Sequence, residues 1–369
     1  MAVRSTVPMR ALSGVIQPVR IGFVPLVDCA PLLVAEEKGM FRHHGVMVKL
    51  SCEVGWATVR EKLLYRQLDA AHAIAGLALA MRMGISALPM AVVAPFVFNL
   101  HGNAITLSRD LWNRGVRDAV SLHKLLRSSS GRVLTLGVVS RFSSHAFLMR
   151  QWLATGGMIN GDRVRMVVLP PTQMASNLAA GLIDGYCVGE PWNSVAVDSG
   201  AGWIVATSEQ LAPDHPEKVL LTSERFIKEH QDQAAAIVAA LREACAFCDV
   251  AENRPEVVSI LLQSGCFPEC HHALHQSLIG PLDLGTGEVA GVSDFHIFHR
   301  RDANAPAPER GAWLVQEFLR QGLIAPTQRK AAEAALIDCW VALPDAQPPK
   351  NVRTQKRTIR NKTATLTPA

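Results

Sequence analysis

The sequence lacks a long apolar run. Across its 369 residues no apolar stretch reaches the length of about 18 residues that a membrane-spanning helix needs. The first twenty residues contain two prolines and no continuous apolar segment, so we expect no secretory signal peptide. These absences favour a cytoplasmic protein without a membrane association.

Common catalytic motifs are also missing. The sequence has no nucleophile elbow, no His-Glu-x-x-His, no P-loop and no Gly-x-Gly-x-x-Gly after its first predicted strand. We therefore expect no enzyme and no cofactor. A Cys–His hydrolase built on Cys29 stays open, although only the residue types favour it.

The net charge of +5 comes from one end of the chain. Residues 350–369 carry six basic residues and no acidic one, and the remaining chain is close to neutral with 31 basic and 32 acidic residues. Without apolar periodicity, residues 346–369 are predicted to form a disordered basic tail. The tail has no aromatic residue for stacking on bases, so we expect no direct contact with nucleic acid.

Eight cysteines are scattered through the chain, which suits free thiols in a reducing compartment. The segments "CAFC" and "CFPECHHALH" leave a zinc site open as an alternative. Its ligands would come from Cys245, Cys248, Cys266, Cys270, His271, His272 and His275. Because "CAFC" falls inside an alanine-rich predicted helix without a knuckle turn, we expect no metal.

Strands and helices alternate along the chain. Apolar runs at 19–26, 46–51 and 69–75 predict strands separated by helices, and the alternation starts again at 132–140. This pattern is typical of an α/β fold with parallel sheets. The segments "LLYRQLDAAHA" and "NLAAGLIDGYCV" place Asp69 and Asp184 at corresponding positions, which predicts two similarly built lobes.

The segment "SRFSSHAFLMRQWLATGG", residues 140–157, contains an unusual histidine. Its apolar spacing predicts a helix that Ser143 or Ser144 caps and that Gly156 ends. His145 then lies in the first turn, where the helix dipole disfavours an imidazolium. Free backbone N–H groups at that end could bind an anion beside it, and a neutral surface histidine is the alternative.

Ligands of open α/β sheets bind beyond the carboxyl ends of the strands. The turns there hold further candidates: His72 as a pocket or core residue, and Asp28 as a pocket residue or a helix cap. We expect Glu190 and Trp192 to hold their turn, because a bare carboxylate would repel an anion.

At these turns the fragments "IGFVPLVDCAPL", "GWATVREKL", "HGNAITLS", "IDGYCVGEPWN" and "PEKVLLTSERF" occur in order. Together they resemble the nitrate- and bicarbonate-binding branch of periplasmic-type solute-binding proteins. The resemblance implies a two-lobed fold (type II) with a hinge and a cleft between the lobes. The implied ranges are an N-terminal extension at 1–17, lobe one at 18–104 and 216–345, and lobe two at 105–215.

The resemblance also implies an anion site in the cleft. The matching positions are Trp56, Asn103, His145 and Lys218, and backbone at Pro171, Val188 and Gly189 is expected to complete it. Trp56 and His145 would donate N–H groups, and Lys218 would supply a positive charge.

The ligand implied is nitrate or nitrite. Without an export signal, the chain resembles the cytoplasmic nitrate/nitrite sensors of that branch, so we expect a sensor that controls an RNA-binding antiterminator partner. Two alternatives stay open: the substrate-binding component of an ABC transporter for nitrate, bicarbonate or another small anion, and an enzyme resembling the precursor-synthesis relatives of this fold.

Overall fold

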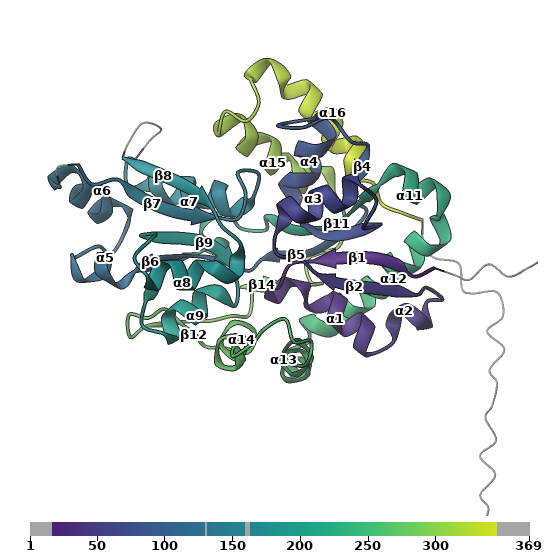
Figure 1. Cartoon of the computed structure of the whole chain (residues 1–369), viewed down its shortest axis with the longest axis horizontal. Helices are drawn as coiled ribbons and strands as arrows, with labels where there is room; N and C mark the ends of the chain where they lie inside the picture. Colours follow the sequence, from purple (N-terminus) through teal and green to yellow (C-terminus); the bar gives the residue numbers. More distant parts are fainter. Residues whose placement is uncertain (1–16, 130, 159–162, 345–369) are drawn as a thin grey trace, which may run out of the picture.

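The structure is a computed structural model that describes residues 17–129, 131–158 and 163–344. The predicted basic tail at 346–369 and all but the last residue of the predicted N-terminal extension lie outside these ranges. Within them, no helix is both long enough and apolar enough to cross a membrane. Two β-sheets with helices on their faces lie side by side, which confirms the predicted α/β class (Figure 1).

Seven strands of the described residues form the first sheet, in the order β14-β5-β11-β3-β1-β2 with β4 beside β11. They are β1 (Val19–Phe23), β2 (Val48–Cys52), β3 (Ala70–Ile74), β4 (Val92–Val93), β5 (Val97–His101), β11 (Pro216–Ser223) and β14 (His296–Ile297). β1 pairs in parallel with β2 and β3, as the alternation predicts. β11 returns antiparallel to β3, so the sheet is mixed.

Five strands of the described residues form the second sheet, in the order β10-β6-β9-β7-β8. They are β6 (Asn103–Ser108), β7 (Leu134–Val138), β8 (Val164–Val168), β9 (Gly185–Gly189) and β10 (Gly202–Thr207). β7 pairs in parallel with β8 and β9, while β6 runs antiparallel to β9 and β10. A short hairpin of β12 (Leu282–Asp283) and β13 (Val289–Ala290) stands apart from both sheets.

The internal echo in the sequence has a structural counterpart. Asp69 precedes β3 and accepts a hydrogen bond from the backbone N–H of Arg20 in the neighbouring β1. Asp184 precedes β9 and accepts one from the backbone N–H of Thr135 in β7. Each aspartate thus ties the start of one strand to the parallel strand beside it, which confirms that Asp69 and Asp184 correspond.

Helices cover both sheets. Those of the first lobe are α1 (Ala30–Glu37), α2 (Met40–His43), α3 (Trp56–Leu64), α4 (Ala75–Met83), α11 (Glu224–Glu229), α12 (Gln231–Asp249), α13 (Arg254–Gln263), α15 (Pro308–Arg320) and α16 (Arg329–Cys339). Those of the second lobe are α5 (Arg109–Asn113), α6 (Ala119–Ser128), α7 (Ser144–Thr155), α8 (Met174–Ala179), α9 (Trp192–Asp198) and α10 (Ser208–Leu211). The helix α14 (His271–Leu278) packs against both α13 and α9.

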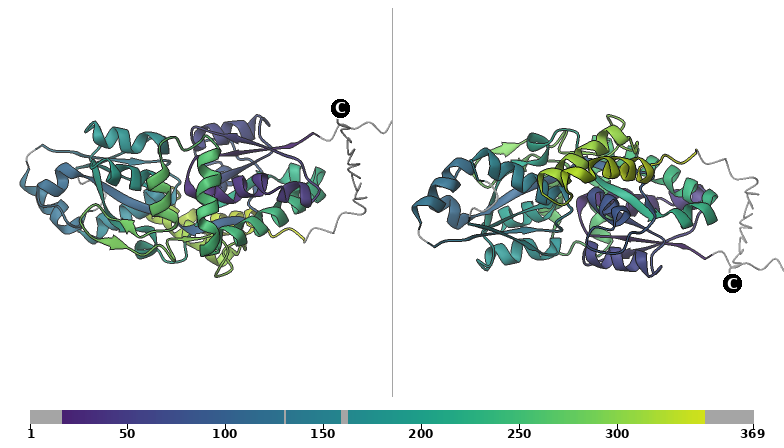
Figure 2. Two further views of the ribbon diagram at one scale, coloured as in Figure 1. Left: turned by 90° about the horizontal axis from the view of Figure 1, so that it is seen from below. Right: turned by 90° about the horizontal axis from the view of Figure 1, so that it is seen from above.

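The chain crosses between the sheets at two places. β5 passes directly into β6 through Gly102, and residues 208–215 lead from β10 back to β11. The family resemblance implies hinges near 104–108 and 213–220. The first crossing precedes 104–108, because residues 103–107 already pair within the second sheet. The β12–β13 hairpin belongs to the range expected for lobe one, yet Leu282 packs with Ile204 of the second lobe. Figure 2 shows the resulting elongated molecule from two sides.

Candidate functional site

Lys218 of β11 lies at the centre of the predicted site, and its side chain is fully buried. Its Nζ donates hydrogen bonds to Asp28 Oδ2 at 2.7 Å and to Glu217 Oε1 at 2.6 Å. Burial by itself would lower the pKa of Lys218, but the two carboxylates outweigh burial and raise that pKa above its ordinary value. The ammonium group is therefore charged, and its charge is shared with two internal carboxylates.

Glu217 is the member of the site that the sequence did not reveal. Consecutive side chains of a regular strand point to opposite faces, so Lys218 on one face would place Glu217 on the other. The pairing of β11 with β5 is irregular between Pro216 and Lys218, and this bulge brings both side chains together. No signal in the sequence marks the bulge.

The Glu217 carboxylate is fully buried and surrounded by donors. Besides Lys218, it accepts a hydrogen bond from the Ser144 hydroxyl, and the Nε2 atoms of His145 and His215 lie 3.1 and 3.3 Å from its oxygens. Burial would raise the pKa of Glu217, but the lysine and the two histidines hold it well below its ordinary value. This side chain is ionised and only accepts hydrogen bonds.

His145 comes to the site from the second lobe. Ser143 caps α7 by accepting a hydrogen bond from the backbone N–H of Ala146, and α7 ends at Gly156, both as predicted. His145 follows in the first turn and is fully buried rather than on the surface. Burial lowers the pKa of its imidazole despite the neighbouring Glu217, so the ring is neutral at neutral pH.

Asp28 and His72 extend the cluster within the first lobe. Asp28 lies in the 3₁₀ turn η1 (Val27–Cys29), where its side chain makes no helix-capping hydrogen bond. Burial would raise its pKa, but Lys218 and His72 reduce it to about 2. His72 Nε2 approaches Asp28 Oδ1 to 3.1 Å, and its ring packs edge-on against Phe98. Asp28 therefore contacts Lys218 directly, and His72 is linked to Lys218 through Asp28.

Trp56 begins α3 and closes the cluster on another side. Lys218 Nζ lies 5.4 Å from the centre of its ring, and the His145 ring stands edge-on at 6.2 Å. Trp56, His145 and Lys218 come from segments far apart in the sequence and from both lobes. The structure thus brings these three predicted residues together.

The remaining predicted residues belong to the second sheet and to the turn after β8. Asn103 pairs with Gly189 and Ala104 with Val188 across β6 and β9. A Cβ at Gly189 would lie only 3.3 Å from Asn103 Oδ1, so the absent side chain leaves room for the amide. Pro171 begins η2 (Pro171–Gln173) after β8, at the same edge of the sheet, and no hydrogen bond between described residues joins it to the others.

Several polar atoms of these side chains are buried and have no hydrogen-bond partner among the described residues. They are Trp56 Nε1, Asn103 Nδ2 and Oδ1, His145 Nδ1 and His72 Nδ1, while Asp28 Oδ1 and His72 Nε2 have only each other, at 3.1 Å. Buried polar groups normally find partners, because an unpaired one costs about 1–3 kcal/mol. The Trp56 indole N–H beside the lysine suits a small oxyanion that accepts hydrogen bonds, and the Asn103 amide in the second sheet is another donor without a partner among the described residues.

Contacts between the lobes hold this arrangement closed. The Val27 N–H donates to the Glu190 carbonyl at 2.7 Å, and the Trp192 indole donates to the Pro25 carbonyl at 2.9 Å. The Glu190 side chain accepts from the Ser194 N–H at the start of α9, so Glu190 and Trp192 hold their turn as expected. Burial raises the pKa of Glu190 to about 7.

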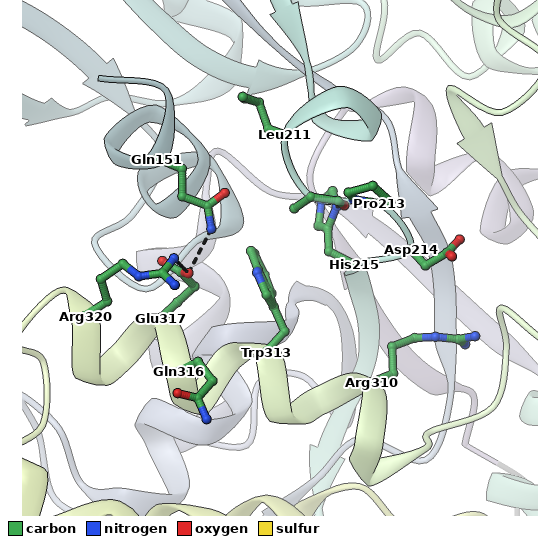
Figure 3. Close-up of a pocket in the computed structure, with 11 residues that line it drawn as sticks. Gln151, Leu211, Pro213, Asp214, His215, Arg310, Trp313, Gln316, Glu317 and Arg320 are labelled. Carbon is green, nitrogen blue, oxygen red and sulfur yellow. Dashed lines mark hydrogen bonds and ion pairs between the residues drawn. The ribbon is translucent and has the colours of Figure 1, made fainter. Parts of the chain in front are cut away.

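A groove of about 590 Å³ lies behind the site, at the return crossing between the lobes (Figure 3). Gln151 of α7 donates across it to Glu317 of α15 at 2.8 Å. His215 borders the groove with its ring 5.2 Å from that of Trp313, while its Nε2 faces Glu217. The groove and the buried cluster thus share a single histidine.

The cysteine- and histidine-rich segments lie in and around the helices α12 and α14. Cys245 and Cys248 are buried inside α12, and the Cys245 thiol lies 3.5 Å from the Phe98 carbonyl oxygen. Across residues 17–129, 131–158 and 163–344, no group of three or more His, Cys, Asp or Glu side chains is placed to hold a metal ion. Burial and Asp28 raise the pKa of the Cys29 thiol well above its ordinary value, which disfavours Cys29 as a nucleophile.

Residues 16–262 match the model of the NMT1-like family. A nitrate/nitrite binding protein NrtA of Synechocystis sp. is 30% identical over 328 residues, which cover 85% of this chain and 72% of that protein. The crystal structure of the periplasmic nitrate-binding protein NrtA from Synechocystis PCC 6803 has a TM-score of 0.82 at 26% identity, and the match covers 88% of this chain and 86% of that one. The predicted two-lobed fold is confirmed.

A longer protein is also similar. The nitrate import ATP-binding protein NrtC of Synechocystis sp. is 37% identical over 307 residues, which cover 82% of this chain and 46% of that protein. This chain therefore spans about half the length of such relatives.

Proposed function

Because the chain belongs to the NMT1-like family, and within it to the nitrate-binding branch of solute-binding proteins, we propose that it binds a small oxyanion between its lobes. It does so as the substrate-binding part of an ABC import system. Nitrate, nitrite and hydrogencarbonate are the candidate ligands, and binding involves no catalytic turnover.

One observation carries this proposal: buried polar side-chain atoms without a partner among the described residues, together with a charged lysine, come from both lobes. Trp56 and Lys218 come from the first lobe, and His145 and Asn103 from the second. An anion among them would contact both lobes, and only a closed protein offers every donor. Binding would therefore favour closure, as a ligand with a higher affinity for one state does.

The longer ATP-binding relatives fit the same proposal. The present chain contains no P-loop, and it matches only about half of the ATP-binding relative. The proposed role is accordingly to recognise the solute and not to hydrolyse a nucleotide.

Calorimetry with nitrate, nitrite, hydrogencarbonate and an alkanesulfonate tests the proposal. We expect one of the first three to bind with one ligand per chain. Trp56→Phe keeps the ring and removes the donor, so it should weaken binding by about tenfold, or about 1.4 kcal/mol. Trp203→Phe is the matched control, because Trp203 is also buried with an unpartnered indole N–H but lies against Trp112 in the second lobe. Equal losses in both variants, or no binding of any oxyanion, would contradict the proposal.

The cytoplasmic sensor that controls an RNA-binding antiterminator is a finer candidate, and it rests on the sequence resemblance alone. The names of the relatives refer to import and to nitrate binding, which favours the transport role. Fractionation of cells, followed by purification of the native protein with its partners, separates the two. Recovery with membrane transport subunits supports the import role, and recovery with an RNA-binding protein in the soluble fraction supports the sensor.

A further inference from the structure

We infer that His145 makes the site respond to whether the oxyanion brings its own proton. An oxyanion without a proton, such as nitrate, binds together with one proton taken up from water, whereas hydrogencarbonate binds without that uptake. The inference rests on the proposed function and concerns the chemistry of the same site.

The first step is the tautomer of His145. Its Nε2 lies 3.1 Å from Glu217 Oε1, and the ionised Glu217 carboxylate can only accept a hydrogen bond. Nε2 must therefore carry the proton of a neutral imidazole. Since a neutral imidazole has one N–H, its Nδ1 presents a lone pair.

The second step is what this lone pair would meet. His145 Nδ1 is buried and has no hydrogen-bond partner among the described residues, and the Trp56 indole N–H next to this ring is in the same condition. An oxyanion that accepts from Trp56 would bring its own lone pairs near Nδ1. Nitrate has no hydrogen to place between them, so only protonation of Nδ1 turns this repulsion into a hydrogen bond. Hydrogencarbonate can donate its O–H to the neutral ring.

The third step is the balance of buried charge. The charged groups that face His145 are Glu217 and Lys218 of β11 and Asp28 of η1, and Trp56 of α3 adds none. These three groups sum to −1, and the other titratable side chains on the two carboxylates are His72 beside Asp28 and His215, which faces Glu217 with Nε2 and the Ala212 carbonyl with Nδ1. A bound monoanion makes this buried cluster more negative by one unit. Burying unpaired charge of one sign is costly, so an imidazolium at His145 is favoured once an anion without its own hydrogen is present. Hydrogencarbonate brings the same charge, but its O–H already occupies the Nδ1 lone pair, so no site for a further proton is left on the ring. Without an anion, burial keeps the ring neutral and able to take up a proton.

Counting protons tests the inference directly. Protein and saturating ligand are mixed at pH 7 in weakly buffered solution, and the acid needed to restore the pH is measured. We expect close to one proton per nitrate bound and close to none per hydrogencarbonate. The nitrate Kd should also rise about tenfold from pH 7 to pH 8, as uptake of one proton requires.

Two variants locate the proton. Glu217→Gln can accept or donate, so His145 is free to carry its proton on Nδ1, and the uptake with nitrate should fall below half a proton. His296→Gln is the control: His296 is also buried, it stacks on Phe98, and no hydrogen bond between described residues joins it to Glu217. It should leave the uptake at one.

Nitrogen-15 spectra of histidine provide a second measurement that needs no variant. Both His145 nitrogens should move to imidazolium values with nitrate and stay neutral with hydrogencarbonate. Nitrate binding without proton uptake would overturn this inference and leave the proposed function standing. If no oxyanion binds at all, the proposed function fails first, and the inference fails with it.

Discussion

Two buried glutamates lie at the boundary between the lobes, in opposite surroundings. Glu217 has a lysine, a serine hydroxyl and two histidines around its carboxylate, and its pKa is well below the ordinary value. Glu190 has only the start of α9 to contact, without a cation, and burial raises its pKa to about 7. Burial alone therefore does not decide the charge of a carboxylate here; the donors around it do.

The comparison depends most on Lys218, the one cation bound to Glu217. Replacing it in Lys218→Met leaves two buried carboxylates without their counter-charge, and we expect a loss of about 3–5 kcal/mol in the free energy of unfolding. Urea denaturation measures it. Lys38→Met is the control, because Lys38 pairs with the exposed Glu256 and should cost no more than about 1 kcal/mol. Equal losses would show that the Glu217 surroundings are not held by charge.

The two glutamates should also respond to pH with opposite signs. The raised pKa of Glu190 means that its contribution to stability is lost as pH rises from about 4.5 to about 7, a cost that reaches about 3 kcal/mol above pH 7. Glu190→Gln removes this cost, so the variant should be the more stable protein at pH 8 and nearly equal to the parent below pH 4.5.

For Glu217 the lowered pKa provides stability above pH 4.5 that disappears as the pH falls. Glu217→Gln should therefore be less stable than the parent at pH 8, and the difference should shrink on acidification. Denaturation curves of both variants at pH 3, 4, 6 and 8 decide the matter, because the Glu217 difference should shrink only below about pH 4.5. If both variants were stabilised, or both destabilised, relative to the parent at pH 8, the contrast between the two glutamates would be wrong.

A smaller effect is expected from the turn that carries Glu190. Trp192→Phe removes the indole hydrogen bond to the Pro25 carbonyl across the lobes, and the loss should be about 1 kcal/mol. In Trp340→Phe the lost indole N–H has no partner among the described residues, so this control should change stability little. Thermal unfolding of both variants measures the difference.

The smallest effect is expected in the segment with Cys245 and Cys248. Cys245 and Cys248 share one face of α12, but both are buried and no third ligand among the described residues is placed beside them, so EDTA or added zinc should shift the Tm by less than about 1 °C. A Tm shift of several degrees would contradict this expectation and would show that the segment binds zinc.

Much of the fold follows from sequence pattern, because strand and helix periods are local. The parallel pairing of β1 with β2 and β3 and the start and end of α7 were all predictable. The correspondence of Asp69 and Asp184 followed from one repeated segment, whereas the contact of Asp69 with Arg20 was seen only in the structure. Element bounds were less exact: the segment "APLLVAEEKGMF" reads as one helix over 30–41, but the structure divides it into α1 and α2 at Gly39, whose φ is 69°.

The site was predictable only in part. Trp56, His145 and Lys218 were identified through the resemblance, but Glu217 was not, since alternation along a strand gives no warning of a bulge. Charge partners depend on side chains that meet across the lobes, and no spacing in the sequence encodes that meeting. The "CAFC" segment shows the reverse: its spacing suggested a zinc site, but its two cysteines are buried packing residues of α12.

A crystal structure of the protein with nitrate tests the central claim most directly. The account predicts the planar anion within hydrogen-bond distance of Trp56 Nε1, between the lobes and beside His145. Density for nitrate only in the groove next to Trp313, or an anion that touches one lobe alone, would contradict it.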